Sequence, residues 1–571
     1  MVFQDSDGSC LAFEKNGDSY TCEETKEYTL EEEPEEQEKT YELEEKTEAR
    51  ETQETVKKTI SYQWTLMDKD QNITRFDANG TMVSQEDANG NFLLYEMDET
   101  GLLKTVTTDK NQSLKMQYND QNLLKEIELA DGTKMQYTYD TAGDLTNAAH
   151  VSADGTQSVQ EPYAYDKEHH MTTITDAEGN DYSVTYEGEK AVRFTKPDGE
   201  YQQITYGDGT TMVSLHKSDG TKISEDSMTY EKNSGKLLSS TNGNGVKTTY
   251  QYEDTENPLL QTGTETTICY QTLENNQVNF KNDVKVTTTT SYDSNENVVE
   301  EVDETGQVTS TTYGTGKESS LAQTEVIKNS EGETTSDTTY DYDDHGNMIL
   351  EYEDIGDSRT EYTYDEDGEV KEEKSYENVK SEWDAGVLTS EQTTQKEEAD
   401  HKVSETLTST QGEVTQEDTT AYDAMGREVS STDRNTGEVT RITYDFMGRA
   451  VETERSLKNQ EGKDTVQTET KSYNANGSVT SETSSAGVTT EYHYDNRNRV
   501  TIAKEDADDA TKTTETSYGY ETAVIHTLAG TKTYKDLQVQ TTKVNGTVTD
   551  KTWTDHAGNA VRTLSSGIYT D

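Results

Sequence analysis

Carboxylates are the side chains of this sequence with the widest range of chemistry. The 571 residues include 115 Asp and Glu against 50 Lys and Arg, which gives a formal net charge of −65. Two carboxylates that face each other across a cleft can hydrolyse glycosidic bonds, and loops rich in carboxylates bind calcium. Acidic pairs occur along the whole chain, however, so their spacing identifies no particular pair. We therefore predict no catalytic residue and a chain that is not an enzyme.

Two short segments come closest to a metal-binding pattern. Residues 68–72 read Asp-Lys-Asp-Gln-Asn, like the start of a calcium loop, but Ile73 occupies the position where such a loop needs glycine. His169 and His170 are adjacent, and neighbours along a strand face opposite sides, so one ion would not easily reach both rings. We expect two exposed histidines beside a turn. The sequence predicts no metal and no cofactor.

Charge and composition exclude several classes of partner. Nucleic-acid binding needs a basic surface, so this acidic chain predicts no nucleic-acid partner. Only 29% of the residues are hydrophobic, and no apolar run approaches the ~20 residues of a membrane span, so we expect no membrane insertion. Cations or a basic protein would complement the charge. Residues 1–20 lack the basic start and apolar stretch of a signal peptide. The three cysteines form neither a disulfide framework nor a zinc spacing.

A recurring phrase of tyrosine, aspartate and glycine is the main sign of organisation. It reads Tyr-x-Tyr-Asp-x-x-Gly at its clearest, and copies recur about every 21 residues where the register is strict. Such a fixed period indicates stacked units along one direction. The residues that we single out as the structural motif are Tyr137, Tyr139, Asp140, Gly143, Tyr340, Tyr342, Asp343, Gly346, Tyr362, Tyr364, Asp365, Gly368, Tyr422, Asp423, Gly426, Tyr444, Asp445, Gly448, Tyr492, Tyr494 and Asp495.

The elements that would carry this motif are short strands joined by tight turns. A second, weaker turn signal lies between the copies, as in Asp131-Gly132 and Asp198-Gly199, so a turn arrives about every ten residues. The segments between turns are rich in Thr, Tyr and Val, which favour strands. Residues two apart in a strand share a face, so the paired tyrosines of each copy should form ladders across the sheet as packing residues.

The sequence predicts an all-β fold of repeated antiparallel β-hairpins that form one long spiralling sheet. We divide it into an acidic N-terminal segment, residues 1–58, and a repeat region, residues 59–571. Residues 31–58 are dense in Glu and Lys and include Pro34, so a solvated linker is favoured over an exposed helix. The N-terminal segment would then be partly a linker, or the remnant of an upstream domain. The hairpin rhythm blurs over residues 255–335 and 372–415.

The motif with its intervening acidic-glycine turns resembles the YD repeat of the Rhs superfamily, over roughly residues 60–565. That superfamily includes bacterial polymorphic toxins, wall-associated proteins and teneurins. The resemblance implies a sheet wound into a hollow shell, which in bacterial members encloses a C-terminal toxin domain, and an extracellular or cell-surface location. The Asp-Pro self-cleavage motif of releasing members is missing, because the four prolines follow Glu33, Glu161, Lys196 and Asn257.

Two roles remain open from the residues. The first is a non-enzymatic scaffold, part of a secreted or surface protein, whose partner is an enclosed toxin or effector polypeptide. The alternative is a cell-surface adhesion or carbohydrate-binding module whose partner is a surface ligand, since exposed tyrosines can stack on sugar rings. Tyrosines in a line on the surface would favour the alternative.

Overall fold

Antiparallel β-strands make up almost all of the regular structure. A computed structural model describes residues 2–4, 10–16, 19–22, 28–45, 54–253, 260–274, 277–382, 384–399, 402–411, 414–458, 464–507, 510–527, 530–556, 558–565 and 567–570. The one helical element in this part of the chain is a single 3₁₀ turn, η1 (Gly316–Glu318). Strands β4 to β46 form one antiparallel sheet of 43 strands that does not close into a barrel. The predicted all-β hairpin sheet is therefore confirmed.

The strands follow the chain in order, and each pairs with the next. Their bounds are β1 Val2–Gln4, β2 Cys10–Asn16, β3 Ser19–Cys22, β4 Tyr28–Glu45, β5 Glu54–Asp68, β6 Ile73–Phe76, β7 Met82–Glu86, β8 Phe92–Met97, β9 Leu103–Thr108, β10 Ser113–Tyr118, β11 Leu124–Glu128, β12 Lys134–Tyr139, β13 Leu145–Val151, β14 Ser158–Tyr165, β15 Met171–Thr175, β16 Asp181–Glu187, β17 Lys190–Thr195, β18 Tyr201–Gly207, β19 Thr210–His216, β20 Lys222–Tyr230, β21 Leu237–Thr241, β22 Lys247–Gln251, β23 Gly263–Glu274, β24 Gln277–Tyr292, β25 Val298–Val302, β26 Val308–Tyr313, β27 Ala322–Lys328, β28 Thr334–Tyr342, β29 Met348–Glu353, β30 Ser358–Tyr364, β31 Val370–Glu377, β32 Val387–Ala399, β33 Lys402–Gln411, β34 Val414–Tyr422, β35 Glu428–Asp433, β36 Glu438–Tyr444, β37 Ala450–Lys458, β38 Asp464–Tyr473, β39 Val479–Thr483, β40 Thr489–Tyr494, β41 Val500–Ala507, β42 Ala510–Thr527, β43 Gly530–Val544, β44 Thr547–Thr554, β45 Ala560–Ser565 and β46 Ile568–Thr570.

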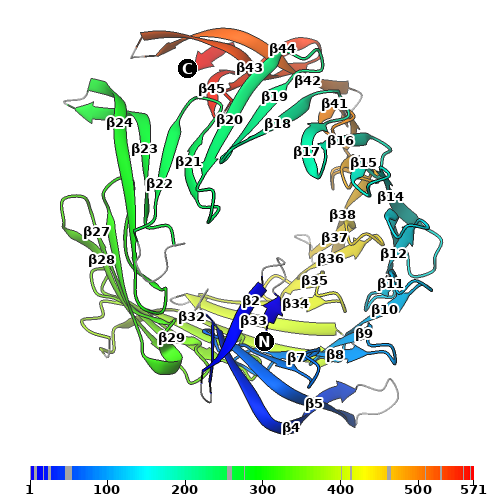
Figure 1. Cartoon of the computed structure of the whole chain (residues 1–571), viewed down its shortest axis with the longest axis vertical. Helices are drawn as coiled ribbons and strands as arrows, with labels where there is room; N and C mark the ends of the chain where they lie inside the picture. Colours follow the sequence, from blue (N-terminus) through cyan, green and yellow to red (C-terminus); the bar gives the residue numbers. More distant parts are fainter. Residues whose placement is uncertain are drawn as a thin grey trace.

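The sheet winds around a central space and then continues alongside itself (Figure 1). We call residues 69–244 the first coil, residues 320–556 the second coil and residues 245–319 the crossover. Side chains join the two coils at points far apart in sequence. The Ser320 hydroxyl donates to the Lys69 carbonyl at 2.9 Å, and Asn244 Nδ2 donates to Asp555 at 2.8 Å. The contacts between them fall along one line, which we call the seam.

The acidic N-terminal region differs from the linker that its composition favours. Residues 28–45 form β4, which pairs with β5 across the boundary that we placed at residue 58. Leu30, Tyr41 and Leu43 are buried, with exposed fractions of 3%, 4% and 1%. The alternation of Tyr41 and Leu43 with glutamates is a strand period that the dense charge conceals. The linker expectation is thus wrong for residues 31–45, while the domain division itself stays a prediction.

The small sheet β1–β3 covers the start of the large one. Phe13 of β2 packs with Leu30, Leu66 and Phe76 in one buried cluster. Phe3 adds edge-on contact with Phe76, at 6.2 Å between ring centres. A second buried cluster, at the other end of the chain, contains Leu537 and Trp553. The two buried clusters thus lie near the two ends of the sheet, and single apolar side chains such as Leu350, Tyr352 and Val379 are buried between them.

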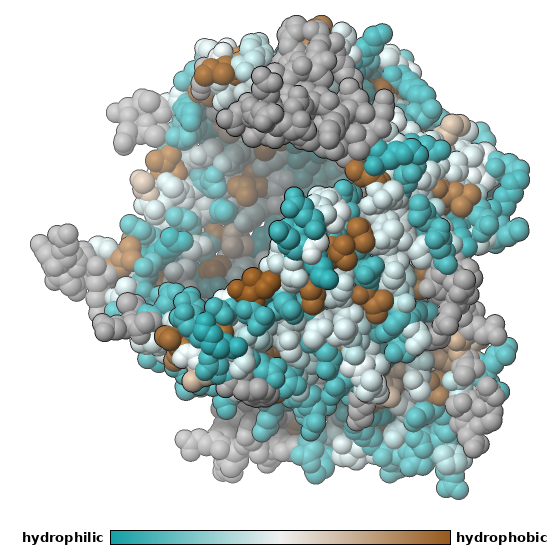
Figure 2. All heavy atoms as spheres, turned by 90° about the vertical axis from the view of Figure 1, so that its left-hand side faces the viewer, coloured by the Kyte–Doolittle hydropathy of each residue, from teal (hydrophilic) through white to brown (hydrophobic). Residues whose placement is uncertain are grey.

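Between these clusters the wall is one sheet thick. Most side chains of the wall strands are half-buried, as in the pattern of β15, where all five residues are intermediate. Such a wall needs few apolar residues, which explains how a chain with 29% hydrophobic content folds. Figure 2 shows the molecule hollowed on the face that it presents, with hydrophilic and hydrophobic residues mixed around the opening. The described part of the chain contains no helix long and apolar enough to cross a membrane.

The hairpin rhythm continues where the motif blurs. Long hairpins take its place: β23 pairs with β24 over the crossover, and β32 pairs with β33 in the second coil. Their length removes the regular turn signal without interrupting the ladder.

Candidate functional site: the repeat turns and the seam

The aspartate of each motif copy organises a tight turn, which we call the YD turn. Oδ1 of Asp140 accepts hydrogen bonds from the amides of Ala142, Gly143 and Asp144, at 2.8, 2.9 and 3.0 Å. The Asp140 amide donates to the Asp144 carbonyl at 3.0 Å. Gly143 has a φ of +98°, a left-handed conformation that favours glycine. The motif residues are therefore turn-forming groups, as an Asp followed by a glycine three residues later predicts.

The same geometry recurs in the other copies. Oδ1 of Asp343, Asp365, Asp423, Asp445 and Asp495 accepts from the amides two and four residues on, at 2.9–3.1 Å. Gly346, Gly368, Gly426 and Gly448 all have positive φ, and Asn498 replaces glycine with a φ of +59°. The amide hydrogen bonds act to lower the pKa of Asp140, with that of Asp144 the strongest.

The second tyrosine of the motif ties one hairpin to the one before it. The Tyr139 hydroxyl donates to the backbone carbonyl of Leu124, the first residue of β11, at 2.8 Å. Each of these tyrosines lies at a register shift, where β12 bulges between Thr138 and Tyr139. The same bond, at 2.5–3.0 Å, joins Tyr118 to Leu103, Tyr186 to Met171, Tyr313 to Val298, Tyr342 to Ala322, Tyr364 to Met348, Tyr444 to Glu428 and Tyr494 to Val479.

The paired tyrosines share one face of the sheet, as their spacing predicts. Tyr137 and Tyr139 are half-buried, while Thr138 between them is exposed. Tyr340, Tyr362, Tyr422 and Tyr492 are half-buried as well. Burial raises the pKa of Tyr342 to about 12. Sequence reasoning assigned these rings to packing and missed the bond from the second tyrosine to the backbone, which depends on where the preceding strand begins.

The two segments with a metal-like pattern serve as turns. Oδ1 of Asp68 accepts from the amides of Asp70 and Asn72, both at 2.9 Å. His169 is exposed, with Nδ1 2.8 Å from Asp144. His170 is not exposed as expected: it stacks on Tyr186 at 4.6 Å and contacts Asp166 and Glu189. Within the described ranges, no group of three or more His, Cys, Asp and Glu side chains is placed to hold a metal ion.

At the seam, the two kinds of turn meet. YD turns of the second coil lie against intervening turns of the first coil. The Ala475 amide donates to Glu178 Oε1 at 2.7 Å, and Asn476 Nδ2 donates to Asp176 at 2.8 Å. Further along, the side chains of Asn347 and Asn89 are joined at 2.8 Å. Sequence reasoning did not predict this pairing, because the partners are about 250 to 320 residues apart.

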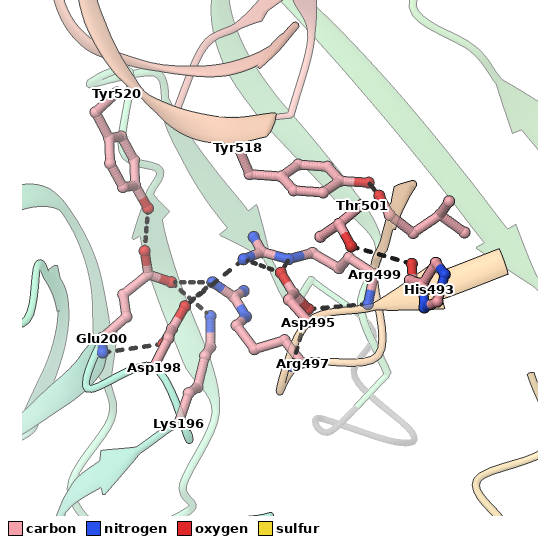
Figure 3. Close-up of polar contacts among 11 residues, drawn as sticks. Lys196, Asp198, Glu200, His493, Asp495, Arg497, Arg499, Thr501, Tyr518 and Tyr520 are labelled. Carbon is pink, nitrogen blue, oxygen red and sulfur yellow. Dashed lines mark hydrogen bonds and ion pairs between the residues drawn. The ribbon is translucent and has the colours of Figure 1, made fainter. Parts of the chain in front are cut away.

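A dense ion-pair network closes one stretch of the seam (Figure 3). Arg497 of the second coil reaches Asp198 at 2.9 Å and Glu200 at 3.0 Å in the first coil. Tyr520 donates its hydroxyl to Glu200, which Lys196 also contacts at 2.9 Å. Burial acts to raise the pKa of Glu200, but these hydrogen bonds and the charge of Arg497 outweigh it and hold that pKa below its ordinary value. Glu200 is therefore buried as an anion with several cationic or donor partners.

Arginine follows the YD turn at three places, all in the second coil. Arg427, Arg449 and Arg499 each place Nε 2.8 Å from the turn aspartate four residues earlier. Each guanidinium also lies over the tyrosine of the next copy, at 5.1, 4.9 and 4.4 Å from the ring centres of Tyr444, Tyr473 and Tyr518. Arg427 additionally lies 3.5 Å from Asp131 across the seam. These arginines connect a turn with the next rung, and Arg427 and Arg499, the latter 3.8 Å from Asp198, also reach the facing coil.

His150 occupies another part of the seam. Its ring packs edge-on against Phe446 of the second coil, at 5.7 Å between centres. Its Nε2 is buried and has no hydrogen-bond partner in the described structure. Burial lowers the pKa of His150, although Asp131 and Asp445 nearby act to raise it. The site is thus built for a neutral ring.

Comparisons with known proteins agree with the repeat assignment. Residues 1–216 match the family model of the teneurin YD-shell, and residues 473–511 match that of the RHS repeat. No curated protein matches the sequence. The crystal structure of TcdB2-TccC3-TEV is similar at 11% identity and a TM-score of 0.44, covering 98% of this chain and 34% of that one. The Photorhabdus luminescens Tc holotoxin pore, with a TccC3 mutation, is similar at 12% identity and a TM-score of 0.44, covering 99% and 33%. This chain spans about a third of the length of those chains. The resemblance drawn from the motif is confirmed.

Proposed function

We propose that this YD/RHS-repeat chain is a non-enzymatic shell segment that encloses a polypeptide, such as a toxin or effector, in a protein acting outside the bacterial cell or at its surface. One observation carries the proposal: a continuous sheet, one layer thick, winds more than once around a hollow. A wall of this kind has only a small core of its own. Its many strands are best explained as a partition between the hollow and the surroundings.

The size of the hollow follows from the strand count per turn. The loop after β5 meets the loop after β26, so one circuit takes twenty-one strands. At about 4.8 Å per strand, the circumference is roughly 100 Å and the diameter at least about 32 Å between backbones, more if the strands tilt. Side chains of about 5 Å on each wall leave roughly 20 Å. An extended or helical chain fits even this lower limit, whereas a folded 100-residue domain, with a radius of gyration of about 13 Å, would need the wider hollow that tilted strands give. The lower limit therefore favours a cargo that is held unfolded.

The tyrosines favour the shell over the adhesion alternative. The tyrosines of the motif are half-buried, and in many copies the hydroxyl of the second tyrosine donates a hydrogen bond to a backbone carbonyl. Stacking on a sugar ring needs an accessible ring face, and rings packed along the wall as ties offer little of it.

Protease protection tests enclosure. A flexible reporter peptide with a protease site is fused after residue 571, the end where bacterial members of the resembled superfamily carry cargo, and in a control before residue 1. We expect cleavage of the first reporter to be about tenfold slower than that of the free peptide, because the wall excludes the protease. Equal cleavage of the fused and free reporters would contradict enclosure. Binding of the chain to cell-surface glycans in that case would support the adhesion role.

A further inference from the structure

We propose that the seam is a latched line along which the two coils separate while the sheet within each coil stays paired, with Arg497 as the principal latch. This regulation rests on the proposed enclosure, because opening the seam would expose the contents of the hollow.

The seam differs in kind from the rest of the wall. Within a coil, backbone ladders join neighbouring strands, as in the six residue pairs of β40 and β41. Across the seam, side chains at the tips of turns make most of the contacts in the described structure, and the Ala475 amide to Glu178 is the backbone amide that crosses. Side-chain contacts at exposed tips contribute less and are lost without breaking a ladder. The seam is therefore the weakest line of the wall.

Both rims of the seam are acidic, and cations bridge them at several places. Lys110 bridges to Asp367 at 2.5 Å, and Lys217 bridges to Asp536 at 2.6 Å. Arg497 bridges to two carboxylates at once and is itself about four-fifths buried. Without a cation between them, carboxylates at this distance repel each other. The net charge of −65 adds a general repulsion between the coils.

The placement of arginine supports a specific role at the seam. In the second coil, the position that follows the glycine slot of the YD turn is arginine in three turns (Arg427, Arg449 and Arg499) and Asn347, Glu369 or Ser478 in three others. In the first coil, the same position is occupied by Thr81, Leu102, Leu123, Asp144 and His170 and, in a turn that is one residue longer, by Lys236. The first-coil YD turns lie on the rim away from the seam. Arginine in this slot is thus found only among the YD turns that face the acidic intervening turns, at three of them.

The crossover supplies the hinge. Strands β22 to β26 connect the coils through continuous pairing, for example between β22 and β23. If the coils separate at the seam, they remain joined through the crossover. The wall would then open on one side and bend at the crossover.

Hydrogen exchange on the full chain tests the latch. Arg497→Ala removes the bridge to Asp198 and Glu200. The matched control is Arg434→Ala, which removes a guanidinium 3.8 Å from Glu417 within the second coil. We expect the Ala475 amide, which donates across the seam, to exchange about tenfold faster in Arg497→Ala than in the wild type, and the strand amides of residues 489–494 to keep their rate. Arg434→Ala should change neither.

The wild-type protein gives a second measurement that needs no variant. Raising the salt from about 50 to about 500 mM shortens the Debye length and should accelerate exchange at Ala475 while sparing the strands. The proposal is overturned if Ala475 keeps its rate under both changes, or if strand amides accelerate equally, since the coils would then open only by unfolding. If the protease cleaves the fused reporter as fast as the free peptide, the proposed enclosure fails while the exchange result at the seam still stands. Failure of the enclosure and failure of the latch can therefore be told apart.

Discussion

At the scale of single residues, the YD motif is a set of hydrogen-bond ties. The aspartate carboxylate satisfies the amides of its own turn, the glycine permits the left-handed backbone, and the second tyrosine bonds a carbonyl of the preceding hairpin. Each residue type makes one kind of local contact, and the repeat places the same contact at successive hairpins along the sheet. The stability of one hairpin therefore depends on contacts made about 15 residues away, as for Tyr139 and Leu124.

The turn aspartate can be tested in one copy. Asp423→Ala removes the acceptor of the Met425 and Arg427 amides, so the local free energy of opening should fall by about 1–2 kcal/mol. Asp423→Asn is the control: it keeps an acceptor for both amides, as Asn119 does at 2.9 and 3.0 Å, and loses only the ion pair with Arg427. Hydrogen exchange of the β34–β35 hairpin measures the difference. Equal losses in the two variants would contradict this account.

The tyrosine tie makes a separate prediction. Tyr364→Phe leaves the Met348 carbonyl without its 2.5 Å partner at a half-buried site and should cost about 1 kcal/mol. Tyr206→Phe should cost less, because Tyr206 is 40% exposed and water can replace its hydroxyl at Ala191. Chemical denaturation of both variants gives the comparison. A larger loss for Tyr206→Phe would show that the tie is not the source of stability.

At the scale of elements, the unit is a hairpin whose turn geometry the sequence specifies well. Asp-x-x-Gly and strand-forming residues predicted the hairpins and their order, because both signals are local. The strand β4 was missed because its glutamates resemble a linker, and its alternation of Tyr41 and Leu43 is short. The seam was out of reach, because no local signal pairs Glu178 with Ala475. Its one trace in the sequence was the uneven placement of arginine after the motif.

The turn conformation gives a prediction for the hairpin. Gly143→Ala forces a Cβ into a φ of +98° and should destabilise the β12–β13 hairpin by about 1–2 kcal/mol. Asn122→Gly is the matched change, since Asn122 already has a φ of +61°, and it should be neutral or slightly stabilising. Hydrogen exchange of the two hairpins distinguishes strain from loss of contacts. If both changes destabilise equally, the conformation is not the cause.

At the scale of the whole molecule, a thin acidic wall is held at the seam by a small number of cations and neutral groups. The fold does not depend on a large core, so its response to solution conditions should be governed by charge. Acidification relieves the general repulsion of the carboxylates, but it also protonates the groups that the seam and the turns require.

The pH dependence follows from the direction of the pKa shifts. His150 has a lowered pKa, so its neutral ring contributes stability above about pH 6.5, and this is lost as the pH falls. Turn aspartates also have lowered pKa values, to about 2 for Asp154, so their contribution is lost below about pH 4. We expect exchange at the seam near His150 to rise first and turn amides to follow. His150→Phe should abolish the first step alone. A first step that survives in His150→Phe would assign it to another group.

The β32–β33 hairpin changes the number of strands in one circuit of the wall. Before it, facing loops are twenty-one strands apart, as for the loops after β5 and β26. After it, the loop that follows β11 faces the loop that follows β34, and the loop that follows β17 faces the one after β40, twenty-three strands apart. One added hairpin thus widens every later circuit by two strands and keeps the turn classes in phase, whereas a single added strand would place YD turns against YD turns. Among related chains, the number of strands per circuit, and with it the width of the hollow, can therefore change only by an even number.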